Sequence, residues 1–334
     1  MLLESSLTFI LALLFILLMK NYAFKLGFID IPNERSSHIK ATPRGAGIGF
    51  VLAFLLVSFL FFKELIMLYP LVYSAIFMVF LIGLLDDSFR INPLMKFFVI
   101  IGSTILLFFN HITIHTLGLF WGVELQLGSF SLLFTIFAVV GFTNALNLID
   151  GLDGLAALLS LVILTAFAFI GWKYHDTFIL TIATLSIAML VAFLLFNWAP
   201  ASIFMGDSGS LTVGFIISIL AIKSLAYIPT VSVLFIAAVP ILDTIIVMVR
   251  RKLSKRAILS ADKCHMHHIF YHILEKNSVK TVLLLGAIQS LYTLFGLQWS
   301  RGINEGYLLL FFIFNTFFFY RLLRWSMKHY QIEC

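Results

Sequence analysis

Five aspartates stand in short polar breaks between long apolar runs of this sequence: Asp86, Asp87, Asp150, Asp153 and Asp207. A carboxylate beside hydrocarbon is costly to desolvate. A convergent set of such groups is expected where a cation is bound or a proton is transferred. The spacing therefore predicts a site whose chemistry depends on carboxylates.

The break from Asn144 to Gly154 holds two amides, two acids and two glycines, with no basic residue among them. An EF-hand calcium loop is excluded, because its alternating ligands and its closing glutamate are absent. Asparagine and aspartate side chains in such a loop can hydrogen-bond a base, a sugar or a metal-bound water. We therefore expect this break to contact a polar substrate.

The break from Asn197 to Ser210 contains Gly-Asp-Ser-Gly at residues 206–209, which resembles the nucleophile segment of trypsin-like proteases. Those proteases are soluble β-barrels, whereas this segment opens an apolar helix, so we set protease chemistry aside. We expect Asp207 or Ser208 to cap a helix that begins near Gly209. The positive ends of this helix and of the helix that starts near residue 154 would then point at the aspartates.

Two further breaks carry basic residues. The segment 30–49 is polar, basic and rich in glycine, so it can bring backbone N–H groups and cations to a phosphate. An ordinary positive-inside loop with helix-packing glycines is the alternative. Asp86 and Asp87 end a helix and repel each other, so both ionise comfortably only near a cation such as Arg90 or Lys96. A solvated helix end is the alternative there.

The segment 250–268 is basic and ends with three histidines, at 265, 267 and 268. Such a cluster can bind zinc, but no second ligand pair follows at zinc-finger spacing. Imidazoles in a basic loop also suit phosphate oxygens, and we favour phosphate over zinc and over an incidental polar loop. Asp243 lies inside an apolar run, where a structural hydrogen bond and a catalytic role remain equally open.

The elements that carry these breaks are membrane helices. Of the 334 residues 61% are hydrophobic and only 11% are charged, more apolar surface than a soluble core can bury. An all-α integral membrane protein with about eleven transmembrane helices is predicted, as a single polytopic domain over residues 1–334. The expected spans are 5–23, 46–62, 65–85, 94–110, 129–147, 154–172, 177–196, 209–227, 229–249, 279–297 and 305–323.

The distribution of basic residues predicts the orientation. With the N-terminus in the periplasm and the C-terminus in the cytoplasm, 18 of the 22 lysines and arginines fall on the cytoplasmic side. All five aspartates of the breaks fall there too. The net charge of +6 therefore reflects topology and is no argument for a nucleic-acid partner. On the periplasmic side, the alternation and central glycines of residues 111–128 predict a small structural β-hairpin.

Five motifs in this order resemble those of the polyprenyl-phosphate N-acetylhexosamine-1-phosphate transferases of glycosyltransferase family 4. These bacterial membrane enzymes start O-antigen, enterobacterial common antigen and teichoic acid assembly, and are related to the translocase of peptidoglycan synthesis. The resemblance covers essentially the whole chain. Its motifs are Ser-His-x-x-x-Thr-Pro-Arg-Gly at 37–45, Asp-Asp at 86–87, Asn-x-x-Asn-x-x-Asp-Gly-x-Asp-Gly at 144–154, Phe-Met-Gly-Asp-Ser-Gly-Ser at 204–210 and His-x-His-His at 265–268.

The resemblance implies transfer of a sugar 1-phosphate from a UDP-N-acetylhexosamine to undecaprenyl phosphate, with release of UMP. It implies Mg²⁺, or Mn²⁺ in its place, and a multi-pass protein of the bacterial inner membrane whose active site faces the cytoplasm, with a homodimer left open. By the same resemblance Asp207 and Asn197 hold the metal, and Asp86 acts on the lipid phosphate with support from Asp87. Substrate binding falls to Lys40, Thr42, Arg44, Lys96, Asn147, Asp150, Asp153, Phe204, His265, His267 and His268.

The sequence departs from the family's pattern at Ala46, where many relatives continue a glycine pair, and at Arg90. Arg90 lies near the acidic pair, where the peptidoglycan enzyme carries lysine, and with the basic 250–268 loop it favours the O-antigen-initiating branch. Two other classes of protein compete with the transferase. A transporter of an anionic substrate would place its acids near the bilayer midplane in two repeated halves, and a membrane scaffold would not need convergent polar breaks.

Overall fold

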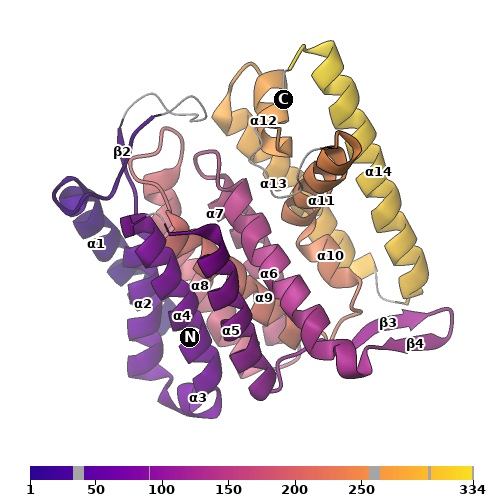
Figure 1. The fold of residues 1–334 in the computed structure, drawn as a ribbon. Helices are drawn as coiled ribbons and strands as arrows, with labels where there is room; N and C mark the ends of the chain where they lie inside the picture. Colours follow the sequence, from indigo (N-terminus) through magenta and orange to yellow (C-terminus); the bar gives the residue numbers. More distant parts are fainter. Residues whose placement is uncertain (33–40, 90, 256–263, 300–301, 333–334) are drawn as a thin grey trace.

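The computed structural model describes residues 1–32, 41–89, 91–255, 264–299 and 302–332 and consists of packed helices with two small two-stranded sheets (Figure 1). In these residues, eight helices are long and apolar enough to cross a membrane, which confirms the all-α membrane fold. They are α1 (Leu2–Leu26), α4 (Pro70–Phe89), α6 (Ser131–Ile149), α7 (Leu155–Lys173), α8 (Thr177–Asn197), α9 (Asp207–Ser224), α13 (Ser278–Leu294) and α14 (Glu305–His329).

The remaining predicted spans correspond to shorter helices. Two of them are α2 (Ala46–Phe61) and α5 (Pro93–Phe109), both apolar. The span expected at 229–249 is divided into α10 (Ser232–Ile236) and α11 (Ala238–Leu253). Hydropathy alone does not reveal such a break, because both pieces are apolar. The number of eleven spans and their orientation remain predictions.

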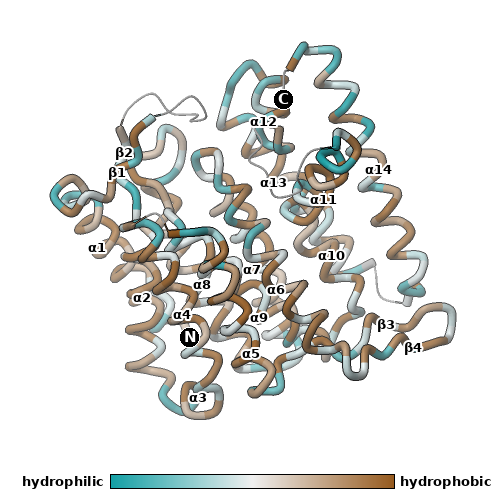
Figure 2. The backbone as a smooth tube through the Cα atoms, viewed as in Figure 1, coloured by the Kyte–Doolittle hydropathy of each residue, from teal (hydrophilic) through white to brown (hydrophobic). Residues whose placement is uncertain are grey.

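Helix boundaries follow local chemistry. The short helix α3 (Lys63–Leu68) ends two residues before Pro70, which opens α4, and Tyr69 stands between them. Proline disfavours helical backbone in the residue before it, yet it fits the first turn of a helix, where its missing N–H has no partner to lose. The span expected at 65–85 therefore begins as two helices. Figure 2 shows that apolar residues follow the helix bodies, while hydrophilic residues gather mainly at the helix ends and connections.

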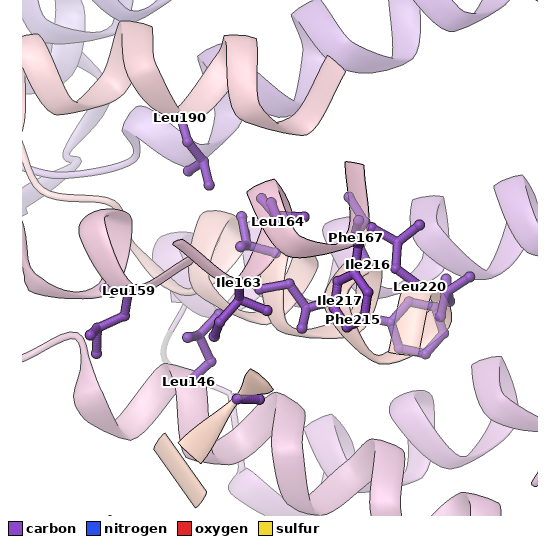
Figure 3. Packing of buried hydrophobic residues seen from close by; sticks show 14 of the residues in the cluster. Leu146, Leu159, Ile163, Leu164, Phe167, Leu190, Phe215, Ile216, Ile217 and Leu220 are labelled. Carbon is purple, nitrogen blue, oxygen red and sulfur yellow. The ribbon is translucent and has the colours of Figure 1, made fainter. Parts of the chain in front are cut away.

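Helix α9 is the centre of the bundle. It packs against α2, α4, α6, α7 and α8 and is the most buried of the eight long helices. Figure 3 shows how Leu146 of α6, Ile163 of α7 and Ile217 of α9 point toward one another in this core. Because α9 is held from all sides, its first residue, Asp207, has a well-defined position.

Glycines let two helices approach the start of α9. A Cβ atom on Gly47 of α2 would lie 2.2 Å from the backbone nitrogen of Gly209. A Cβ atom on Gly83 of α4 would lie 2.5 Å from the carbonyl oxygen of Asp207. Both distances are shorter than any side chain tolerates, so α2 and α4 contact α9 backbone to backbone. Gly47 therefore packs helices as the alternative reading of the first break allows, and Gly83 brings the end of α4 to the start of α9.

The β-hairpin expected at 111–128 is confirmed. Strands β3 (Thr116–Phe120) and β4 (Val123–Gln126) pair antiparallel around Trp121 and Gly122, followed by a 3₁₀ turn at Gly128–Phe130. Glu305 anchors it, because its carboxylate accepts hydrogen bonds from the backbone N–H of Leu119 and of Val231. Figure 1 shows the hairpin at the end of the bundle opposite to the helix α12 (Met266–Ile273).

A second small sheet was not expected from the sequence. Strands β1 (Ile29–Asp30) and β2 (Thr42–Pro43) pair antiparallel at the end of α1. The chain then continues as a single bridge between Arg44 and Phe204, and the carbonyl oxygen of Phe204 accepts a hydrogen bond from the N–H of Ala46. The basic first break is thereby joined to the break that precedes α9.

The close approach at Gly83 predicts a clear difference between two glycines. We expect Gly83→Ala to lower the free energy of unfolding by about 1–3 kcal/mol, because the methyl group overpacks the α4–α9 contact. The matched control is Gly102→Ala in α5, where nothing lies within 4 Å of the added atom. Thermal unfolding in detergent measures both. Equal melting temperatures for the two variants would contradict the backbone contact.

Candidate active site

A cavity of about 320 Å³ lies where the polar breaks meet. It combines acids from the breaks with an arginine, a histidine and an aromatic ring. The lining residues are Asp30, Arg44, Asp87, Asn147, Asp150, Gly151, Leu152, Asp153, Asn197, Phe204, Gly206, Asp207 and His268. Residues that are more than 200 positions apart in the chain therefore share one cavity.

Asp87 binds the N-terminus of α9. Its Oδ1 accepts a hydrogen bond of 2.9 Å from the N–H of Asp207, and its Oδ2 accepts one of 3.0 Å from the N–H of Ser208. Those two N–H groups have no partner within the helix, and the helix dipole favours a negative charge there. The expected cap from the side chain of Asp207 or Ser208 is therefore wrong. A carboxylate from α4 provides it instead.

Gly206 is required for this arrangement. Its φ of +75° lies in the left-handed region that favours glycine. A Cβ atom at this position would also lie 2.6 Å from Asp87 Oδ2. Any side chain here would displace the carboxylate from the helix end.

Lys96 of α5 links two acids. Its Nζ lies 2.7 Å from Asp207 Oδ2 and 3.1 Å from Asp86 Oδ2. The other oxygen of Asp86 accepts a hydrogen bond of 2.8 Å from the N–H of Ile91. The ammonium group therefore compensates Asp86 of the acidic pair, as the sequence led us to expect, and it also neutralises part of the negative charge at the start of α9. Asp86 itself stands beside the cavity and is not part of its lining.

Asn147 orients Asp207 from α6. Its amide nitrogen donates to Asp207 Oδ1 at 3.0 Å and contacts Ser210 Oγ at 2.8 Å. Each carboxylate oxygen of Asp207 thus has a donor, one from Lys96 and one from Asn147. The side chain is held in one orientation at the cavity wall.

Asp150 follows the last residue of α6 and faces the other acids. Burial is the main cause that raises its pKa, to about 7, and the negative charges of Asp207, Asp153 and Asp87 raise it further. Within the described residues its carboxylate accepts no hydrogen bond. Residues 150–154, which we call the aspartate loop, therefore present a carboxyl group that would ionise more readily beside a cation.

Two other residues of the breaks hold loops together. Asn197 is buried, and its amide accepts from the N–H of Gly154 at 2.8 Å and donates to the carbonyl oxygen of Ile203 at 3.0 Å. Asp153 accepts from the N–H of Ala201 at 2.9 Å. Both interactions tie the loop before α7 to the loop before α9. Two of the breaks thus form one rigid unit.

Comparison with known proteins finds similarity in the same part of the chain that forms the cavity. The family model of glycosyl transferase family 4 matches residues 69–225, which contain α4 to α9 and most of the cavity. A protein of Bacillus subtilis named "Probable undecaprenyl-phosphate N-acetylglucosaminyl 1-phosphate transferase" is 33% identical over 297 residues, which cover 85% of this chain and 82% of the relative. The chain belongs to glycosyl transferase family 4. The resemblance drawn from the motifs is confirmed, and its O-antigen branch remains a prediction.

Two further relatives carry the same kind of name. An "Undecaprenyl-phosphate alpha-N-acetylglucosaminyl 1-phosphate transferase" of Haemophilus influenzae is 28% identical over 340 residues, 96% of this chain and 95% of the relative. A protein of the same name from Pasteurella multocida is 32% identical over 138 residues, 40% of this chain and 38% of the relative. The similarity therefore extends from the cavity to the surrounding helices.

The structure of this family 4 member brings most of the predicted site residues together. Lining the cavity are Arg44, Asp87, Asn147, Asp150, Asp153, Asn197, Phe204, Asp207 and His268, with Lys96 and Asp86 next to it. Thr42 differs from the expectation, because it is buried in β2 and does not belong to the described lining. Lys40 and Arg90 lie outside the described residues.

Two of the three histidines also differ from the expectation. His265 and His267 are buried beside Asp243 of α11, with His265 Nδ1 2.9 Å from Asp243 Oδ2, and only His268 lines the cavity. Asp243 holds His265 by this hydrogen bond and lies 3.9 Å from His267 Nδ1, and neither ring belongs to the described lining. Burial lowers the pKa of His267 to about 3, so its ring is neutral at physiological pH.

Sequence reasoning missed Asp30, Ser210 and Gly206 as parts of the site. Asp30 opens the first break, and its charge in an otherwise apolar context was a usable signal. Ser210 and Gly206 gave no such signal, because their roles depend on Asn147 and Asp87 in other helices.

The donor set fits a hard divalent cation. Carboxylates outnumber the basic groups of the lining, since Asp30, Asp87, Asp150, Asp153 and Asp207 face Arg44 and His268. Oxygen ligands of this kind suit Mg²⁺ or Mn²⁺. Burial is the main cause of the raised pKa of Asp150, and the negative charges of Asp207, Asp153 and Asp87 add to it, so a cation beside these groups would lower that pKa.

The cap on α9 predicts different effects for two adjacent acids. We expect Asp87→Asn to lower the free energy of unfolding by about 1–2 kcal/mol, because the helix end loses its negative charge and one of two acceptors. Asp86→Asn is the matched control and should cost less, since that side chain faces Lys96 at the cavity edge. Chemical denaturation in detergent compares them. A larger loss for Asp86→Asn would refute the assignment.

The raised pKa of Asp150 predicts a pH dependence. An aspartate in the unfolded chain has a pKa of about 3.9, so between that value and about 7 the folded protein binds more protons than the unfolded chain. Stability should therefore fall as pH rises through this window when metal is chelated. We expect Asp150→Asn to remove this part of the decline in melting temperature between pH 5 and pH 8. An unchanged slope in that variant would show that another group causes it.

Proposed function

We propose that this protein transfers an N-acetylhexosamine 1-phosphate from a UDP-sugar to undecaprenyl phosphate, releasing UMP and leaving a lipid-linked diphosphate sugar. The observation that carries the proposal is the cavity itself, where carboxylates, an arginine and an aromatic ring meet at the helix ends. The names of the Bacillus and Haemophilus relatives support the same acceptor and the same sugar class. N-acetylglucosamine is the first donor sugar to test.

The location of the cavity supports a lipid acceptor and a soluble donor. The site stands at the ends of α4, α6 and α9, close to where a membrane helix meets water. A phosphate on a lipid carrier and a nucleotide from solution can meet at such a depth. We propose that the protein lies in the bacterial inner membrane, with this end facing the cytoplasm, and that it starts O-antigen or another envelope polysaccharide. We also propose that two copies of this chain form a homodimer.

The chain's own residues divide the work. Arg44 faces the cavity and donates to the carbonyl oxygen of Asp87, so its charge is fixed where a diphosphate would bind. Phe204 provides a ring on which uracil can stack. Asn147, Asp150, Asp153 and His268 line the same cavity and would contact the nucleotide. Lys40, from the first break, would add a second cation for the phosphates.

Asp207 is the proposed metal ligand, and Asn197 stays a weaker candidate because both ends of its amide already bind the backbone. When bound, Mg²⁺ or Mn²⁺ would neutralise diphosphate oxygens and stabilise the charge that moves to the leaving UMP. Lys96 would shift from Asp207 toward phosphate as the cavity fills. Asp86 would orient the lipid phosphate for attack, while Asp87 keeps α9 in place.

A transporter of an anionic substrate is less well supported. Its acids are expected near the middle of the bilayer in two repeated halves. Here the acids gather at helix ends on one side of the bundle. A cavity that places an aromatic ring beside phosphate-binding groups suits a nucleotide-sugar better than a translocated ion.

The experiment is an assay of UMP release from purified protein with undecaprenyl phosphate, Mg²⁺ and a panel of UDP-N-acetylhexosamines. We expect Asp207→Asn to lower Mg²⁺-dependent turnover by about 100-fold or more, because removing one group that stabilises charge in the transition state typically has an effect of this size. The matched control is Glu124→Gln, the same kind of change on the exposed hairpin, which should leave turnover unchanged.

Failure has two distinct forms in this assay. Folded protein that releases no UMP with any donor would refute the transferase proposal. Full turnover in Asp207→Asn would leave the transferase in place and remove Asp207 from the metal site.

A further inference from the structure

The cluster of Asp243, His265 and His267 lies outside the cavity lining and has no part in the proposed transfer. A carboxylate oxygen of Asp243 and one ring nitrogen of each histidine all lie within 4.8 Å of one another. The three side chains are almost fully buried. From the sequence we favoured phosphate over zinc, because no second ligand pair follows the histidines at zinc-finger spacing. Asp243 supplies a further ligand from another helix, 22 residues earlier in the chain.

His267 is the observation that points to a ligand. Its side chain is 1% exposed, and neither ring nitrogen has a hydrogen-bond partner within the described residues. Buried imidazoles normally satisfy at least one nitrogen. Its Nδ1 lies 3.9 Å from Asp243 Oδ2, too far for a hydrogen bond. Its Nε2 lies against Gly151, where an added Cβ atom would come within 2.5 Å. Nδ1 is thus the nitrogen that faces the cluster.

The chemistry of the cluster favours a cation over a phosphate. A buried carboxylate at its centre repels an anion and attracts a metal ion. The donors are one carboxylate oxygen and two imidazole nitrogens, a set that binds Zn²⁺ with a water in the fourth position. In a tetrahedral zinc site neighbouring donors are about 3.3 Å apart. The separations of 2.9 Å and 3.9 Å from Asp243 Oδ2 lie on either side of that value.

The surroundings resemble the outer shell of a metal site. The second oxygen of Asp243 accepts a hydrogen bond from the N–H of Met266, which fixes the carboxylate plane. Ligating carboxylates in proteins are commonly held in this way. Both contacts of Asp243 are to the start of α12, so a metal here would fasten α12 to α11.

We propose that Asp243 Oδ2, His265 Nδ1 and His267 Nδ1 bind a structural Zn²⁺ ion. The ion would hold the first turn of α12 and thereby place His268, the next residue, at the cavity. It would also support Gly151 through the His267 ring, and so the loop that carries Asp150 and Asp153. This site is separate from Asp207 and does not depend on the proposed transfer reaction.

The test measures metal directly. The full-length protein is purified in detergent, exposed to Zn²⁺, desalted and analysed for metal by mass spectrometry. We expect about one zinc per chain, bound by these three ligands, and retention of this zinc in His272→Asn and Asp207→Asn. His272 lies on the same helix but is exposed, and Asp207 belongs to the cavity. His267→Asn should weaken zinc binding by more than about tenfold, the loss that even an outer-shell change can cause.

A second measurement uses only the native protein, so the proposal can still be tested if His267→Asn fails to fold. Metal-stripped native protein is titrated with Co²⁺, and the intense visible absorption of tetrahedral Co²⁺ is followed; an octahedral site of oxygen ligands absorbs only weakly. We expect saturation at one tetrahedral ion, with displacement by Zn²⁺. Native protein that retains no zinc and shows no tetrahedral band would overturn the proposal. Undiminished zinc in folded His267→Asn would overturn it as well.

Discussion

The carboxylate of Asp87 at the N-terminus of α9 is the interaction on which the rest of the site depends. It joins α4 to α9 by two hydrogen bonds to backbone N–H groups, 120 and 121 residues away. The negative charge is tolerated in a buried place because the helix end is positive and its N–H groups need acceptors. Gly83 and Gly206 leave room for the contact. Asp207 is the first residue of the helix that is held, so its position follows from that of Asp87.

Electrostatic balance then organises the remaining groups. Lys96 stands between Asp86 and Asp207, and Arg44 lies over the end of α4, yet the acids of the cavity exceed these cations. Such an excess is less costly at the ends of membrane helices than among the lipid chains, because backbone donors, water and ions are available there. The same excess makes the cavity suitable for a metal-bound diphosphate. The apolar core around α9 provides a rigid support and no chemistry of its own.

The histidine motif shows how one buried acid redirects neighbouring side chains. The basic segment before it favours phosphate, but Asp243 turns His265 and His267 toward α11 and leaves His268 at the cavity. Gly151 packs against His267, so the histidine motif and the aspartate loop support each other. The two motifs are more than 100 residues apart in the chain.

The sequence by itself determined the helical membrane fold, the hairpin at 111–128 and the breaks in which the site is found. Those features depend on the length and composition of local runs, and water or lipid acts on each run independently. Only the tertiary structure decided that Asp87 caps α9 while its neighbour Asp86 faces Lys96. It also decided that Asn197 connects two loops and that Thr42 is buried in β2 beside Asp30. It also decided that the span at 229–249 is divided and that Asp243 meets the histidines. A polar break shows that a residue needs a partner; which partner it finds depends on how distant helices pack, and no local pattern contains that information.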